Sequence, residues 1–578
     1  MKSIAGLPVR RELVRTTAIL ALLVAPPAAP PTNPDFGPNV TIFDPTTPAA
    51  SIQATLDTVF ALQESSEFGE RRFAFLFKPG TYTVSARVGF YTQLSGLGLS
   101  PDDVIINGGV RADARWRKGN ATLNFWRVAE NLSVNPTNGV DQWAVSQAAP
   151  MRRMHIRGNL VLDDGGWSSG GFLADSKVDG QVKSGSQQQW LTRSSELGSW
   201  TGANWNMVFV GTGNAPVNSF PNPPYTTITS APVIREKPFL YVDARGVWKV
   251  FVPALRSNAS GITWGSGAAP GISHPIGEFA IMKPGSSATA MNDALARNKN
   301  LIITPGFYHM DAPLHITRAG TVVLGLGLAT LVADNGVSAI TVDDVDGVTI
   351  AGVLIDAGAT NSPLLMQVGA SGSSANHSSH PTLLSDVFFR IGGAGVGKAT
   401  QSLQINSNNV IGDHLWLWRA DHGNGVGWMS NTAADGLVVN GNDVTMYGLF
   451  VEHYQRYEVQ WNGNGGRTYF FQNEMPYDVP NQAAWMNGTM RGFAAYQVGS
   501  TVTSHEAWGL GSYCFFNKDS TVGAEHAFEV PAAPNVRFHN MVIVSLGGGK
   551  GTIAHVINDA GAAATAGASV QTLVRGPL

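Results

Sequence analysis

The chain has 578 residues, of which only 14% are charged, and its formal net charge is −3. This balance excludes a basic field for nucleic acid, and the length indicates several domains or one long repetitive domain. With 66 glycines and 32 prolines, the composition favours an all-β chain with many tight turns. The single cysteine, Cys514, excludes an intramolecular disulfide, and the absence of CxxC and HxxxH spacings predicts no structural metal site.

Residues 1–30 have the features of an export signal. Arg10 and Arg11 lie in a positive segment, the apolar run 16–25 follows, and small residues and prolines come next. The run is too short to span a bilayer. The Arg10-Arg11 pair resembles a twin-arginine signal, and a Sec signal is the alternative that stays open. Either signal predicts a secreted, extracellular protein with no membrane attachment after export.

Two long segments of the mature chain share one order of elements: a short helix, two strands around a Pro-Gly turn, and a G-L-G turn. These elements fall at 51–63, 75–84 and 94–108 in the first segment and at 288–298, 301–310 and 323–336 in the second. An order of this length rarely recurs by chance. We therefore predict two copies of one architecture.

The second segment also carries a shorter repeat, in which a valine is followed five positions later by another apolar residue. Two short strands joined at a small or polar turn residue fit this pattern. The intervals are irregular, as expected of a parallel β-helix whose coils accept insertions at their turns, and they disfavour a β-propeller. The shortage of long amphipathic helices disfavours a TIM barrel. The pairs are Val348/Val353, Val410/Leu415, Val444/Leu449 and Val536/Met541.

The predicted fold is therefore all-β, with two tandem parallel β-helices. We expect the first to span about residues 35–265 and the second about residues 275–560. The stretch 261–278 between them is rich in Gly, Ser and Pro, which is typical of a linker.

Two glutamates in the segment 450–478, Glu452 and Glu474, are 22 positions apart. That interval is about one coil, and coils stack roughly 4.8 Å apart, so we expect both carboxylates on neighbouring coils and facing one groove. Two carboxylic acids beside a groove are the minimum for hydrolysing a glycosidic bond. An acid beside aromatic rings has a raised pKa, as a general acid needs, and the rings near Glu474 predict this. The plain alternative is a pair of solvated surface glutamates.

Two segments of the first copy, 141–158 and 162–195, are dense in Gln, Ser, Trp and Asp. Amides and hydroxyls beside Trp suit neutral sugar hydroxyls, and a Gln/Ser ladder along β-helix turns is the alternative. Together with motifs of the second copy, these segments resemble glycoside hydrolase family 55, the exo-acting β-1,3-glucanases or laminarinases. The matching motifs are WAVSQAAPMRRMHIRG, GGWSSGGFLADSKVDG, GSQQQWLTR, NWNMVFVG, FVEHYQ and FFQNEMPYDVP.

The resemblance spans most of the mature chain. It implies two right-handed, single-stranded parallel β-helices of the pectin-lyase-like class, with the substrate cleft between them and no metal or other cofactor. It also implies anomeric inversion and release of glucose from the non-reducing end of laminarin-type β-1,3-glucans. Carried over position by position, it predicts the catalytic residues Glu474, Glu452, Gln147 and Ser169 and the substrate contacts Tyr477, Trp418 and Asp421.

The resemblance gives these residues distinct roles. Glu474 matches the general acid, and Glu452 matches the second glutamate, which helps to hold or activate the water. Gln147 and Ser169 complete the contacts of that water, although Ser168 adjoins Ser169 in the sequence. Whether Glu452 is itself the base or acts through Gln147 and Ser169 stays open, because both mechanisms give the same sequence.

The predicted function is thus a secreted, monomeric, inverting exo-β-1,3-glucanase. A β-helix polysaccharide lyase or polygalacturonase is a second hypothesis, but such enzymes favour clustered Asp beside Arg or Lys, or calcium. The segment 450–478 contains only Arg456 and Arg467 and no such Asp cluster. A non-catalytic carbohydrate-binding β-helix is a third hypothesis; such proteins usually trimerise.

Overall fold

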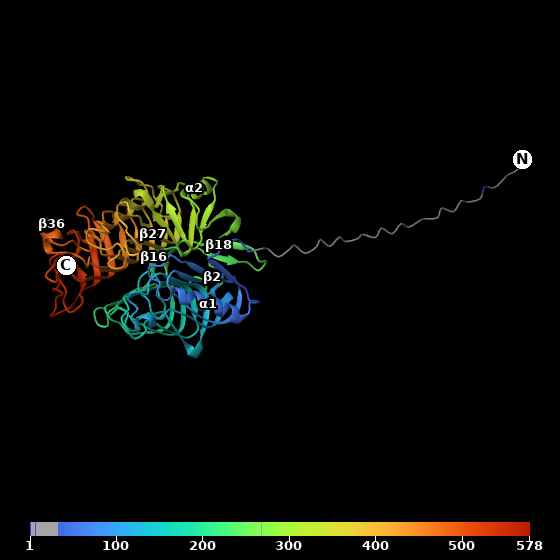
Figure 1. Cartoon of the computed structure of the whole chain (residues 1–578), viewed down its shortest axis with the longest axis horizontal. Helices are drawn as coiled ribbons and strands as arrows, with labels where there is room; N and C mark the ends of the chain where they lie inside the picture. The colour runs from blue at the N-terminus through green and yellow to red at the C-terminus, as the bar shows by residue number, and fades with distance from the viewer. Residues whose placement is uncertain (2–5, 7–32, 268, 578) are drawn as a thin grey trace. The chain divides into compact units, whose positions relative to one another are not determined.

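The structure is a computed structural model that describes residues 33–267 and 269–577, together with Met1 and Gly6. The predicted export signal, residues 1–30, lies outside the described residues apart from those two positions. The chain divides into two compact units, Met1–Asn33 and Pro34–Leu578. The second unit consists of two stacks of parallel strands, drawn from blue to green and from green to red in Figure 1. None of the helices in the described part is long and apolar enough to cross a membrane.

The first stack begins with β1 (Val40–Phe43) and ends with β15 (Tyr225–Ile228). Its main parallel sheet runs in the order β1-β2-β4-β6-β8-β10-β12-β14-β15. The intervening strands of this sheet are β2 (Phe73–Phe77), β4 (Thr92–Gly96), β6 (Arg127–Pro136), β8 (Pro150–Ile156), β10 (Phe172–Ala174), β12 (Gln189–Arg193) and β14 (Asn206–Val210). Strands on the outer sides of the coils are β3 (Gly80–Arg87), β5 (Val104–Arg111), β7 (Val140–Gln142), β9 (Asn159–Val161), β11 (Lys177–Lys183) and β13 (Glu196–Thr201).

A connecting region of antiparallel strands joins the two stacks. β16 (Ala231–Ile234) pairs with β19 (Arg256–Ala259), and β18 (Trp248–Pro253) lies between β17 (Phe239–Val242) and β20 (Gly271–Pro275). Part of the Gly-rich stretch 261–278 is therefore a strand, because β20 completes this small sheet.

The second stack has two parallel sheets, ordered β21-β22-β25-β27-β29-β31-β33-β35-β39-β41 and β24-β26-β28-β30-β32-β34-β38-β40-β42. The first contains β21 (Phe279–Met282), β22 (Asn300–Ile303), β25 (Val322–Ala333), β27 (Thr349–Ala357), β29 (Leu383–Ile391), β31 (Ile411–Arg419), β33 (Thr445–Glu452), β35 (Gly466–Glu474), β39 (Ser504–Cys514) and β41 (Asn535–Ser545). The second contains β24 (Leu314–Ile316), β26 (Ile340–Val342), β28 (Ser362–Val368), β30 (Ala399–Ile405), β32 (Asp435–Val439), β34 (Val459–Trp461), β38 (Tyr496–Val498), β40 (Gly523–Glu529) and β42 (Thr552–Ile557).

The stack extends beyond residue 560. β43 (Val570–Gly576) pairs antiparallel with β41 and covers the edge that the last parallel coil leaves open. The strands thus continue past the predicted end of the second domain. The division into domains at 35–265 and 275–560 stays a prediction.

A helix opens each stack, as the repeated order of elements predicted. α1 (Ala49–Gln63) buries Ile52, Leu56 and Phe60 against the first coils, and α2 (Ala288–Ala296) does the same with Met291 in the second stack. The side chain of Ser287 accepts a hydrogen bond from the Ala290 N–H and so caps α2. The two copies of one architecture are therefore present in the structure.

The valine repeat marks one corner of the coils. Val353, Val387, Leu415, Leu449 and Phe471 lie side by side on consecutive strands and form part of the core. The residue before each of them is left-handed, and this bend turns the strand toward the next face of the coil. These corner residues are Gly352, Asp386, His414, Gly448 and Phe470, with φ from 51° to 72°. The predicted turn residue between two short strands is thus confirmed.

The stacks pack against each other through a mixed apolar and ionic interface. Phe172, Leu191 and Val208 of the first stack share one core cluster with Phe388 and Phe450 of the second. Two glycines permit this close approach: a Cβ atom on Gly448 would lie 3.0 Å from the Phe172 ring, and one on Gly509 would lie 2.4 Å from Val208.

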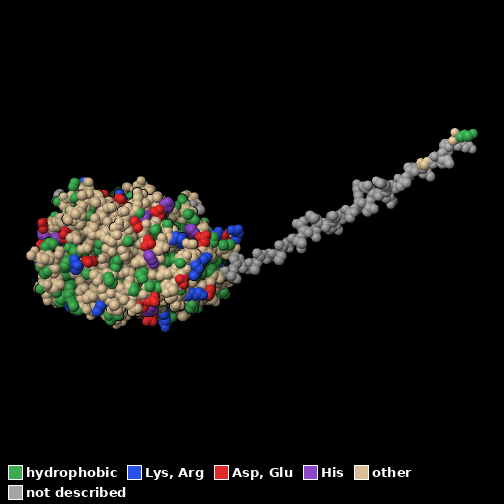
Figure 2. Space-filling model, turned by 90° about the horizontal axis from the view of Figure 1, so that it is seen from above, with side chains coloured by type: hydrophobic (Ala, Val, Ile, Leu, Met, Phe, Trp, Pro, Cys, Tyr) green, Lys and Arg blue, Asp and Glu red, His purple; other side chains and the backbone are tan. Residues whose placement is uncertain are grey.

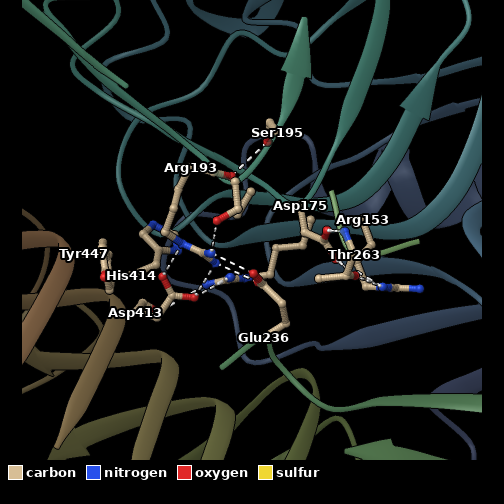
Figure 3. A network of polar contacts seen from close by, with 12 residues as sticks. Arg153, Asp175, Arg193, Ser195, Glu236, Thr263, Asp413, His414 and Tyr447 are labelled. Atoms are coloured by element: carbon tan, nitrogen blue, oxygen red, sulfur yellow. Dashed lines mark hydrogen bonds and ion pairs between the residues drawn. The ribbon is translucent and has the colours of Figure 1, made fainter. Parts of the chain in front are cut away.

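Buried ion pairs complete the interface (Figure 3). Arg152 contacts Asp386 at 2.8 Å and Asp413 at 2.7 Å. Arg193 lies between Asp413 and Glu236. Lys237 of the connecting region contacts Glu130 at 2.8 Å. On the face in Figure 2, by contrast, charged side chains are scattered, as the low charge content suggests. A dense cluster of paired charges therefore lies inside the interface.

Candidate active site

Glu452 and Glu474 end two neighbouring strands, β33 and β35. Phe450 pairs with Gln472 in register, and the His453 N–H donates to the Glu474 carbonyl oxygen at 2.8 Å. One carboxylate oxygen of each glutamate and a ring nitrogen of His453 lie within 4.8 Å of one another. The predicted placement of the two acids on neighbouring coils is therefore correct.

Glu452 lies in the interface between the stacks and is only 2% exposed. The Gln147 side-chain amide, which precedes β8 in the first stack, donates to Oε1 at 2.8 Å, and the Trp416 indole N–H donates to Oε2 at 2.8 Å. Burial, together with the nearby charge of Glu474, raises the pKa of Glu452 well above its usual range. This carboxyl group is therefore buried, polarised and bonded at both oxygens.

Glu474 is more accessible, with 17% of its side chain exposed. The Tyr477 hydroxyl donates to Oε2 at 2.6 Å, and His453 Nε2 lies 3.4 Å from the same oxygen. Within the described residues these are its side-chain contacts, and both leave Oε1 free to meet a ligand. Phe471, by contrast, packs in the core of the second stack and Phe470 in the interface, so these sequence neighbours do not form the wall beside Glu474.

Burial between the stacks, together with the second carboxylate on the neighbouring coil, raises the pKa of Glu452. Sequence neighbours alone could not show this, because strand geometry sends alternate side chains to opposite faces.

A row of charged side chains continues from Glu474. Burial would lower the pKa of His453, but Asp421 and Glu474 raise it to about 9, so its ring is protonated at neutral pH. Burial would raise the pKa of Asp421, but His453 and His422 lower it to about 2. His422 lies between Asp421, at 2.8 Å, and Glu67 of the first stack, at 2.6 Å; these carboxylates outweigh burial and raise the pKa of His422 to about 10.

The triad of Glu452, His453 and Glu474 has the geometry to hold a metal ion. The Nδ1 atom of His453 lies 3.1 Å from the Met475 carbonyl oxygen, and its Nε2 atom lies 3.4 Å from Glu474.

Ser169 faces the second stack, where it accepts a hydrogen bond from the Gln472 side-chain amide at 3.2 Å. Its neighbour Ser168 instead contacts Ser186 of the first stack at 3.2 Å. The two adjacent serines are thereby distinguished: Ser169, and not Ser168, points toward the strand that carries Glu474.

The remaining predicted substrate contacts lie in the same region, with unequal exposure. Tyr477 is half-buried beside Glu474, and 23% of the Asp421 side chain is exposed. Trp418 is only 1% exposed, because its ring stacks between Phe68 and Trp416 at centroid distances of 6.3 and 5.0 Å. Little of the Trp418 ring is open to a ligand, so its direct contact with a sugar stays a prediction.

The structure brings all seven predicted residues together and adds others. Trp416 contacts Glu452 and Gln472 contacts Ser169. Gln472 lies inside the motif FFQNEMPYDVP, and Trp416 lies two positions before the predicted contact Trp418. Glu67 follows the first helix, where no sequence pattern marks it. Its place beside His422 depends entirely on how the two stacks meet.

Comparison with known proteins agrees with this geometry. Residues 279–474 match the LAM55 pectate lyase-like domain. The chain is 56% identical over 530 residues to an exo-beta-1,3-glucanase of Streptomyces sp. (strain SirexAA-E / ActE), a match that covers 91% of this chain and 87% of the relative. The solved structure of sacteLam55A from Streptomyces sp. SirexAA-E matches with a TM-score of 0.93 and 54% identity, over 94% of this chain and 99% of that one.

A glutamate-to-alanine variant of sacteLam55A in complex with glucose matches with the same TM-score of 0.93. Paired parallel β-helices around two carboxylates define a glycoside hydrolase of the pectate-lyase-like fold. The chain belongs to glycoside hydrolase family 55.

Proposed function

We propose that this chain is a secreted exo-β-1,3-glucanase that releases glucose from the non-reducing end of laminarin-type glucans with inversion. The observation that carries the proposal is the pair Glu452 and Glu474 on neighbouring coils, opposite Gln147 and Ser169 of the other stack. The relative that is 56% identical is named an exo-beta-1,3-glucanase, and a solved relative contains glucose.

Glu474 is the general acid in this proposal. It is the more exposed member of the pair, and its contacts at Oε2 leave Oε1 available to protonate the leaving glycosidic oxygen.

Glu452 acts on the face of the sugar where the attacking water binds. Both its oxygens accept N–H groups, so it is poorly placed to attack a sugar carbon itself. It instead orients the Gln147 amide, whose oxygen, with the Ser169 hydroxyl, directs water to the face opposite the leaving group.

The separation of the two carboxylates gives a competing argument. Inverting glycosidases keep their carboxyls about 6.5–9.5 Å apart to admit water, and retaining ones about 5–5.5 Å. One oxygen of each carboxylate lies within 4.8 Å of the other, so the pair is closer than the inverting range. Burial and full hydrogen bonding of Glu452 argue against a nucleophile, and we therefore place the water beside Gln147 and Ser169 and not between the two glutamates.

Product analysis on laminarin tests the proposal. We expect glucose to be the product from the first minutes, and proton NMR at early times to show the α-anomer. Release of the β-anomer would overturn inversion and favour a covalent intermediate on Glu452. The absence of any glucose from the purified protein would overturn the glucanase assignment itself.

Secretion is a separate part of the proposal and has its own test. Residues 1–30 fused to a reporter should direct its export, and Arg10→Lys with Arg11→Lys should block export by the twin-arginine route but not by the Sec route. Sedimentation of the exported protein should give a single chain of 61.2 kDa or slightly less, since a monomer is expected.

A further inference from the structure

One segment of the first stack crosses to the second beside the row of charged residues. Residues 64–72, which we call the strap, connect α1 to β2. The strap is anchored at its C-terminal end by Arg72, whose guanidinium lies over the Tyr91 ring at 3.8 Å and the Phe307 ring at 4.1 Å. Arg72 also donates to Thr330 of the second stack at 2.9 Å. The strap is therefore held to both stacks.

The tip of the strap lies against the loop that carries Asp421. Glu67 contacts His422 Nε2 at 2.6 Å, and the Phe68 ring stacks parallel to Trp418 and edge-on to His422. Since Trp418 belongs to the ring cluster that also includes Trp416, the strap is packed directly on the wall of the candidate active site.

Two glycines of the second stack form the floor beneath the strap. A Cβ atom at Gly393 or at Gly423 would lie 2.6 Å from the Phe68 ring, too close for any other residue. The loops that carry these glycines also bond to each other, between Gly393 and Asn424 at 2.9 Å. The Phe68 ring of the strap thus packs directly against the backbone of Gly393 and Gly423.

The strap also borders the surface of the second stack next to Gly392. A hollow of about 340 Å³ is lined there by Glu70 of the strap and by Gly392, Gly395, Asp334 and Arg390 of the second stack. Gly392 adjoins Gly393 beneath Phe68. The lining of this hollow includes Glu70 of the strap but not Glu474 or Asp421.

We infer that the strap, through Glu67 and Phe68, closes the substrate groove one sugar beyond the catalytic pair and thereby restricts the enzyme to chain ends. This inference rests on the proposed glucanase function and adds its specificity-determining element. Only His453, Asp421 and His422 separate Glu474 from Glu67, each in contact with the next. A glucan bound at the pair can extend away from the strap but not through it.

The test is whether opening the strap permits cleavage inside a chain. The substrate is laminarin whose terminal units have been oxidised with periodate and then reduced; internal β-1,3-linked units survive because they lack adjacent free hydroxyls. The unaltered protein should release only glucose from native laminarin and act poorly on the oxidised polymer. The double variant Glu67→Ala/Phe68→Ala should hydrolyse the oxidised polymer about tenfold faster than the unaltered protein and release oligosaccharides.

Matched variants keep the test decisive. Ser65→Ala changes an exposed strap residue and should leave the products unchanged. If the double variant does not fold, Glu67→Gln and Phe68→Ala, made singly, replace it. A folded variant that still releases only glucose and gains no action on the oxidised polymer overturns the inference. If the unaltered protein releases no glucose from native laminarin, the proposed function fails, which is a different result.

Discussion

Two buried clusters of charge lie in the same interface and behave in opposite ways. In the ion-pair cluster around Arg152 and Arg193, burial would raise the pKa of Asp386, but Arg152 and Lys237 hold it well below its usual range. In the acid pair, burial and a second carboxylate raise the pKa of Glu452. Both carboxyls are almost fully buried, so the difference lies in their partners.

The comparison shows that one interface both holds the two stacks together and contains the reactive carboxyl groups. Guanidinium groups neutralise Asp386, Asp413 and Glu236 with paired hydrogen bonds, so these carboxylates are fixed and unreactive. Within the described residues, the hydrogen bonds to Glu452 come from the neutral N–H groups of Gln147 and Trp416, and burial keeps its pKa raised. A carboxyl group stays reactive where the interface places no guanidinium or ammonium group in direct contact with it.

The largest effect is expected at the acid. Glu474→Gln should lower glucose release from laminarin by about 10³-fold, because an amide cannot protonate the leaving oxygen. The midpoint of thermal unfolding should stay close to that of the parent. Glu525→Gln, a partly exposed glutamate paired with Arg491, is the control and should retain full activity. Near-parental activity of Glu474→Gln would remove this residue from the mechanism.

Removing a cationic side chain from the ion-pair cluster should cause the largest loss in the free energy of unfolding. Arg193→Met leaves Asp413 and Glu236 buried with one partner fewer, and we expect a loss of about 3–5 kcal/mol in the free energy of unfolding. Denaturant titration measures it.

Arg235→Met is the matched control, because Arg235 is also buried but donates to the neutral acceptors Pro381 and Thr349. Its loss should be smaller, about 1–2 kcal/mol. Equal losses for the two variants would show that the ion pairs add nothing beyond hydrogen bonding, and the contrast with the acid pair would fail.

A substitution in the acid pair should change the free energy of unfolding in the opposite direction. Glu452 has a folded-state pKa above its ordinary value of 4.5, so its contribution to stability is present below pH 4.5 and is lost as the pH rises through the folded-state pKa. Glu452→Gln removes the buried charge. We expect this variant to match the parent near pH 4 and to exceed it by about 1–2 kcal/mol at pH 7.

Thermal unfolding across this pH range measures the difference between Glu452→Gln and the parent. The variant should also lose glucanase activity, a trade of function against stability that is typical of active-site carboxylates. A stability difference that does not change with pH would mean that Glu452 has the same pKa in the folded and the unfolded protein, and the comparison would have to be abandoned.

The smallest effect is expected from removing one of the neutral N–H donors to Glu452. Trp416→Phe removes an N–H that favours the charged form of Glu452, so the pKa of Glu452 should rise further. Since the water side needs a charged carboxylate, the acidic limb of the kcat profile should move by about one pH unit to higher pH. Trp126→Phe is the control: its indole lies in the same ring cluster but has no hydrogen-bond partner in the described part of the chain. A shift of equal size in both variants would point to altered packing.

Much of the fold could be predicted because each coil repeats a local rule. A valine and an apolar residue five positions later give two inward side chains around one left-handed corner, and the structure places Val353, Leu415 and Leu449 side by side as this rule requires. The same rule placed Glu452 and Glu474 on neighbouring coils, 22 residues apart. Family resemblance then supplied Gln147 and Ser169.

The residue pairs that could not be predicted from the sequence are those that join the two stacks. Gln147 and Glu452 are 305 residues apart and Glu67 and His422 are 355 apart, and no periodicity links such pairs. The burial of Trp418 and the role of Glu67 follow from the strap, which leaves no sequence signature.

The sequence therefore determined the coils, their register and the spacing of the two acids, because the core of a β-helix constrains every coil in the same local way. Only the docking of the two stacks decided which carboxylates meet arginine, which meets only neutral donors, and where the groove is closed. Those outcomes depend on three-dimensional proximity, since an interface selects partners by shape and charge without regard to their separation along the chain.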